Sequence, residues 1–87
     1  MSPDMPDRLN AETVTELRSA LAETEENRAA VLRLAEARGD PGLVGLRDAT
    51  IAAARRALVE PGVGNLIRFW ACLDRERRAL AAAGEAP

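Results

Sequence analysis

Two turn signals divide this chain into three helix-forming segments. Residues 39–42 read Gly-Asp-Pro-Gly, and residues 61–62 read Pro-Gly. Such clusters end helices. Between them, apolar residues recur at helical intervals, whereas β-branched residues and strict alternation are sparse. Because short connections make consecutive helices antiparallel, the sequence predicts an all-α fold, an antiparallel three-helix bundle with a long first helix.

Capping residues set the expected helix bounds. Asn10 can cap the first helix, or Thr13 with Glu16 can form a capping box one turn later. Gly39 supplies a left-handed C-terminal position, and Asp40-Pro41 can start the second helix. The sequence predicts one helical domain over residues 9–84, with helices at about 10–38, 41–59 and 65–83 and tails at 1–8 and 85–87.

The chain has too few large side chains for a thick core. It has 87 residues, Phe69 and Trp70 are its only aromatic residues, and much of its apolar content is alanine. Residues 41–59 are especially rich in alanine, which lets neighbouring helices approach closely, so we expect this segment to be central. The first helix, roughly 40 Å long, should overhang the other two, each about 28 Å. We therefore expect oligomerisation or a protein partner to cover part of the apolar surface.

The composition disfavours most catalytic chemistry. The chain has no histidine, lysine or tyrosine, so Cys72 has no histidine or lysine neighbour that would activate it as a nucleophile. Di-metal helical bundles use histidine ligands, which this chain lacks, so we expect no metal. We also expect no cofactor and no catalytic residue. A net charge of −2 argues against nucleic-acid binding, which needs a basic face.

The sequence favours a cytoplasmic protein. A single cysteine cannot close an internal disulfide, and residues 1–7 lack the order of a signal peptide. No apolar run approaches the roughly 20 residues that span a bilayer, so we expect no membrane partner. Because all twelve basic residues are arginine, the chain fits a GC-rich, bacterial genome.

The largest apolar side chains gather in residues 66–73, and Trp70 belongs either to the core or to an interface. We expect a small interaction module, an adaptor, regulator or accessory subunit, that binds a protein partner or a second copy as a homodimer. The predicted interface residues are Leu66, Phe69, Trp70, Leu73, Arg77, Leu17 and Leu21.

Three arginines, Arg28, Arg47 and Arg77, interrupt the apolar stripes of the helices. Because an unpaired buried guanidinium is very costly, each must reach solvent, meet a carboxylate or bind an anion. The candidate carboxylates are Glu25, Asp48 and Asp74. Alternatively, the arginines set the register with a partner, or they converge on a phosphorylated or dicarboxylate ligand. This last reading makes the chain an anion-binding or catalytic helical bundle.

Charge is also distributed unevenly along the chain. The first half of helix 10–38 is acidic, and the last helix carries Arg75, Arg77 and Arg78 toward its C-terminal end. An antiparallel match between these two regions is electrostatically favourable. It can operate within one chain or between two chains.

Overall fold

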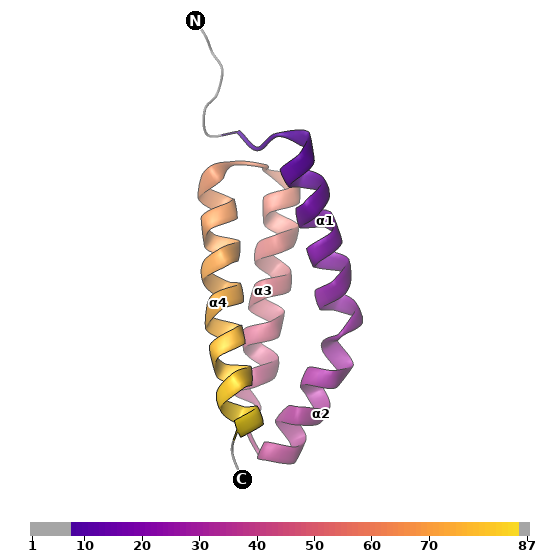
Figure 1. Ribbon diagram of the computed structural model, residues 1–87, viewed down its shortest axis with the longest axis vertical. Helices are drawn as coiled ribbons and strands as arrows, with labels where there is room; N and C mark the ends of the chain where they lie inside the picture. The colour runs from indigo at the N-terminus through magenta and orange to yellow at the C-terminus, as the bar shows by residue number, and fades with distance from the viewer. Residues whose placement is uncertain (1–7, 86–87) are drawn as a thin grey trace, which may run out of the picture.

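The computed structural model describes residues 8–85, which form four α-helices joined by short turns (Figure 1). The helices are α1 (Ala11–Glu26), α2 (Arg28–Arg38), α3 (Gly42–Val59) and α4 (Val63–Glu85). The predicted all-α class is confirmed, since these residues form no strand beyond an isolated bridge between Arg8 and Gly62. None of the helices in this part of the chain is long and apolar enough to cross a membrane. The predicted tails fall largely on residues 1–7 and 86–87, which lie outside the described range.

The predicted count of three helices is wrong, because the first helical segment breaks in two. The sequence predicts one helix over residues 10–38, yet α1 ends at Glu26 and α2 begins at Arg28. The Thr24 hydroxyl donates to the carbonyls of Ala20 and Leu21 at 3.0 and 2.8 Å, a pattern that bends helices. The Thr24 carbonyl accepts from Nη1 of Arg47 at 2.9 Å instead of from the amide four residues later. A tertiary contact therefore replaces the helical hydrogen bond at the break.

Local capping chemistry places the helix ends. The Asn10 side chain accepts a hydrogen bond from the Thr13 amide at 2.8 Å and caps α1. Gly39 adopts the left-handed conformation, with φ of 65°, and ends α2. The Leu9 amide donates to the Pro61 carbonyl at 3.0 Å, which ties the start of α1 to the turn between α3 and α4.

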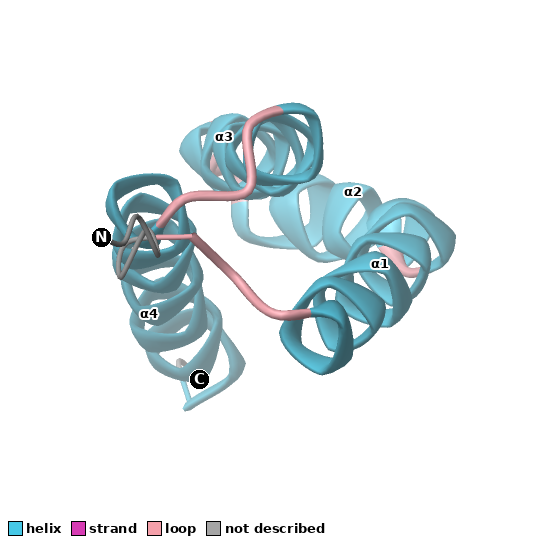
Figure 2. Ribbon diagram, turned by 90° about the horizontal axis from the view of Figure 1, so that it is seen from above, coloured by secondary structure: helices cyan, strands magenta, loops and turns pink. Residues whose placement is uncertain are grey.

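Helix α3 is the central element. It packs against α1, α2 and α4, whereas α1 and α4 lie apart (Figure 2). Side chains of α1 and α4 still meet, because Leu17 and Phe69 belong to one apolar cluster. Ala53, Ala54 and Ala57 are buried on α3, and their small size permits this close packing. Figure 1 shows that α1 and α4 run in the same direction, antiparallel to α3. The alanine-rich segment is therefore central, as its composition indicates.

The interior contains two apolar clusters. The larger joins α1, α3 and α4 and contains Leu17, Ala53, Ala54, Ala57, Leu66 and Phe69. The smaller joins α2 and α3 through Val31, Ala35 and Leu43, with half-buried residues of α4 packed against it. Arg47 lies between these clusters along α3, which makes the centre of the molecule polar.

Candidate functional site

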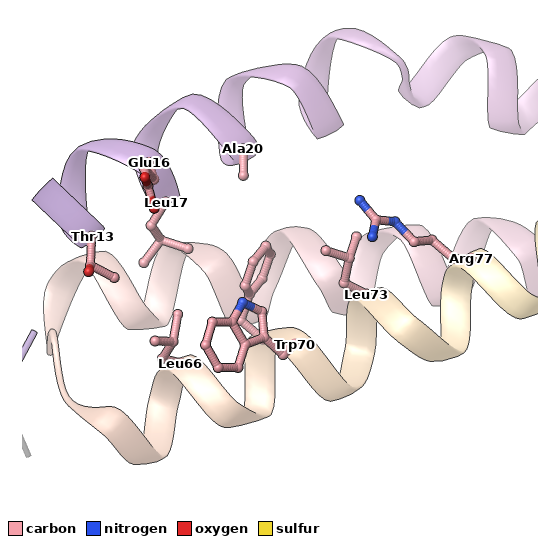
Figure 3. A pocket seen from close by; sticks show the side chains of 9 residues that line it. Thr13, Glu16, Leu17, Ala20, Leu66, Trp70, Leu73 and Arg77 are labelled. Atoms are coloured by element: carbon pink, nitrogen blue, oxygen red, sulfur yellow. The ribbon is translucent and has the colours of Figure 1, made fainter.

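An apolar groove of about 330 Å³ runs between α1 and α4 (Figure 3). It forms because both helices pack on α3 and not closely on each other. The buried side chains of Leu17, Leu66 and Phe69 lie at its base. Ala20 and Leu73 are half-buried and extend the apolar surface. The groove is therefore an outward continuation of the larger core cluster.

The edges of the groove carry exposed side chains. Glu16 lies on the α1 edge, and Trp70 and Arg77 lie on the α4 edge (Figure 3). Trp70 is 57% exposed, and Ile67, one turn earlier on α4, is 56% exposed. Contiguous exposed apolar patches often mark protein–protein interaction sites, which makes this edge of the groove a candidate binding surface.

The structure brings most of the predicted interface residues together. Apart from Leu21, all of them line the α1–α4 groove, and they do so at different depths. Leu17, Leu66 and Phe69 are core residues, whereas Trp70 and Arg77 are exposed. Leu21 is half-buried and packs against the core cluster instead. Of these residues, Trp70 and Arg77 are therefore the ones whose side chains a partner could contact extensively.

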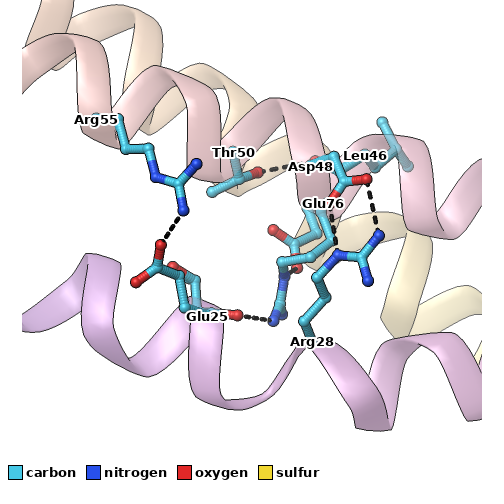
Figure 4. A network of polar contacts seen from close by, with 9 residues as sticks. Glu25, Arg28, Leu46, Asp48, Thr50, Arg55 and Glu76 are labelled. Atoms are coloured by element: carbon cyan, nitrogen blue, oxygen red, sulfur yellow. Dashed lines mark hydrogen bonds and ion pairs between the residues drawn. The ribbon is translucent and has the colours of Figure 1, made fainter.

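Arg28 forms a bidentate ion pair with Asp48 across the α2–α3 interface (Figure 4). Its Nε and Nη2 donate to the two carboxylate oxygens at 2.7 and 3.1 Å. The hydrogen bond to Arg28 lowers the pKa of Asp48 below its ordinary value, and the same bond raises the pKa of Arg28. Both side chains remain about half exposed. The spacing of the apolar residues predicts that Arg28 lies on a buried face, and the structure does not place it there.

Arg47 is buried and forms an ion pair with Glu76 of α4. The exposed fractions of the two residues are 8% and 1%. The guanidinium also donates to the Thr24 carbonyl, so one side chain joins α1, α3 and α4. The Oε1 atom of Glu76 is buried and has no hydrogen-bond partner. This arrangement satisfies the charge of Arg47 within the protein.

Sequence reasoning missed Glu76 as the partner of Arg47. The residues of α4 that face α3 recur at steps of three and four, and Glu76 lies seven residues after the buried Phe69. That spacing could have identified Glu76 as an inward position. Arg77 was predicted there, but it is one residue, or about 100°, further round the helix. Arg77 accordingly lines the groove edge.

The three predicted arginines do not share one ligand site. Arg28 and Arg47 each form an ion pair with a carboxylate. Arg77 faces the groove and forms no ion pair within the described residues. Glu25, the candidate carboxylate on α1, forms an ion pair with Arg55 instead of with one of the three arginines (Figure 4). An anion in the groove would therefore meet one unpaired guanidinium from this set.

Other reactive groups are scattered. Cys72 is half-buried and packs against the larger core cluster. Within residues 8–85, no three carboxylates or thiols lie close enough together to hold a metal ion. No family model, curated protein or solved structure matches this chain.

Proposed function

We propose that this chain is a non-catalytic protein–protein interaction module, an adaptor, regulator or accessory subunit, that binds one further helix in the α1–α4 groove. The observation that carries the proposal is the exposure of Trp70 and Ile67 beside an apolar groove. A helix lying in this groove would contact α1 and α4 together, as in a four-helix arrangement. The half-buried Leu73 and the base of the groove would lose water at the same time.

The chemistry of the groove supports a helical partner. Apolar residues line its centre, and charged residues of opposite sign, Glu16 and Arg77, stand on its two edges. An amphipathic helix presents a matching apolar stripe flanked by charges. Tryptophan is also enriched among the residues that dominate binding energy at interfaces. The single cysteine further supports a cytoplasmic setting for this module.

Site-specific photo-crosslinking in the native host tests the proposal. A benzophenone amino acid replaces Trp70, and a matched variant carries it at Ala52, which is exposed on α3 away from the groove lining. We expect an adduct from position 70, mapped by mass spectrometry to a helix with an apolar stripe, and none from position 52. Equal or absent labelling from both positions would contradict the proposed function.

A further inference from the structure

A continuous stripe of exposed residues runs along α4 at alternating steps of four and three. Such spacing is the signature of a helix that packs along its length against another helix. The first three members are apolar, the next two carry opposite charges, and the last two are small. All are exposed, and they are Val63, Ile67, Trp70, Asp74, Arg77, Ala81 and Gly84.

We propose that the helix bound in the α1–α4 groove is α4 of a second copy of this chain, lying antiparallel to the first. This inference rests on the proposed function, because it names the partner of that same groove. A two-fold axis relates the copies, so each α4 lies in the groove of the other. The second α4 contacts the exposed stripe of the first.

One register of this antiparallel pair satisfies both charge and size. When Asp74 faces Arg77 of the second copy, Arg77 faces Asp74 of the second copy by symmetry. The same register sets Trp70 against Ala81 and Ile67 against Gly84, so each large side chain meets a small one. Arg77, which has no ion pair within the described residues, gains one. Asp74 keeps its exposed partner Arg78, 3.1 Å away, on the same helix.

Other pairings of the two stripes are less favourable. A parallel pairing would set Asp74 against Asp74 and Arg77 against Arg77, and directly opposed like charges repel. Sliding the antiparallel pair by one heptad toward the N-termini would bury Asp74 against Trp70 and Arg77 against Ile67. Desolvating both charges against apolar side chains costs free energy without compensation.

Charge on the α1 edge supports the same orientation. Glu16 lines the groove, and Glu12 and Glu23 are exposed one and two turns away along α1. Because α1 and α4 run in the same direction, an antiparallel second α4 also runs antiparallel to α1 (Figure 1). The exposed Arg75 and Arg78 of the second copy then pass along this acidic edge. A second copy therefore supplies both the apolar and the charged complement of the groove.

Sedimentation equilibrium with charge variants tests the inference. The wild type should dimerise at micromolar concentration. Asp74→Arg and Arg77→Asp each place like charges across the axis, so each should raise the dimer dissociation constant at least about tenfold. An equimolar mixture of the two variants should recover the dimer, because it restores both opposite-charge pairs. Arg33→Asp, on an exposed position of α2, is the control and should dimerise as the wild type does.

Three results would overturn the inference: a monomeric wild type, single variants that dimerise as tightly as the wild type, or a mixture that stays monomeric. Asp74 and Arg77 are exposed, so we expect both variants to fold. Circular dichroism of each variant checks that it does. A monomeric wild type that crosslinks a different protein from position 70 would end this inference and leave the proposed function standing. A monomeric wild type with no adduct would end both.

Discussion

The guanidinium of Arg47 and the carboxylate of Glu76 lie between the two apolar clusters, where an unpaired charge would be very costly. Glu76→Gln removes the negative partner, so we expect the free energy of unfolding to fall by about 3–5 kcal/mol. The double variant Arg47→Met with Glu76→Leu replaces both charges by apolar side chains and should recover most of that loss. Urea denaturation at pH 7, followed by circular dichroism, measures both. A double variant no more stable than Glu76→Gln would contradict this account.

Asp48 gives the fold a pH dependence. Pairing with Arg28 lowers the pKa of Asp48 in the folded state below its ordinary value of 3.8. The stabilisation from this pair is therefore fully present above the unfolded pKa and is lost as the pH falls through the folded pKa. We expect wild type to exceed Asp48→Asn in stability at pH 5–7 and the difference to shrink below about pH 4. Chemical denaturation across this range, with a constant difference as the contrary result, tests the prediction.

At the scale of helices, the sequence predicts what local chemistry decides. Asn10 caps α1 through its own side chain, Gly39 ends α2 through its left-handed backbone, and both are found in the predicted roles. The break after Thr24 depends on Arg47, which is distant in sequence, so helical spacing alone gave no sign of it. The sequence predicts Arg77 at an inward position of α4, but the inward residue is its neighbour Glu76. Both residues are charged, so the apolar stripe does not distinguish between them. Buried ion pairs thus limit what periodicity can predict.

Two glycines on neighbouring elements should respond to alanine in opposite ways. Gly39 has φ of 65°, a conformation that strains other residues, so Gly39→Ala should cost about 1 kcal/mol. Gly45 lies within α3, and a methyl group there would meet no atom within 4 Å. Gly45→Ala should therefore stabilise the protein by about 0.5–1 kcal/mol, because alanine favours helix. Thermal denaturation of the two variants checks the sign of each change.

For the whole molecule, the arrangement of helices decides which apolar residues remain outside. The predicted interface set mixes core and surface positions, because a stripe read from sequence does not show how far apart α1 and α4 lie. The groove between these two helices has Phe69 buried at its base and Trp70 exposed on its edge. Adjacent aromatic residues thus have different surroundings. One supports the fold, and the other is available to a partner.

This division predicts separable effects of two alanine substitutions. Phe69 is 3% exposed, so Phe69→Ala should lower the free energy of unfolding by about 3–5 kcal/mol. Trp70 is more than half exposed, so Trp70→Ala should cost less than about 1.5 kcal/mol in the monomer while weakening association. Each alanine substitution is introduced separately into the Arg77→Asp background, which removes the contribution of dimerisation to the measured free energy of unfolding. Sedimentation of the Trp70→Ala variant without Arg77→Asp measures the association. If Trp70→Ala destabilised the monomer as strongly as Phe69→Ala, Trp70 would be a core residue, and the groove would lose its main anchor.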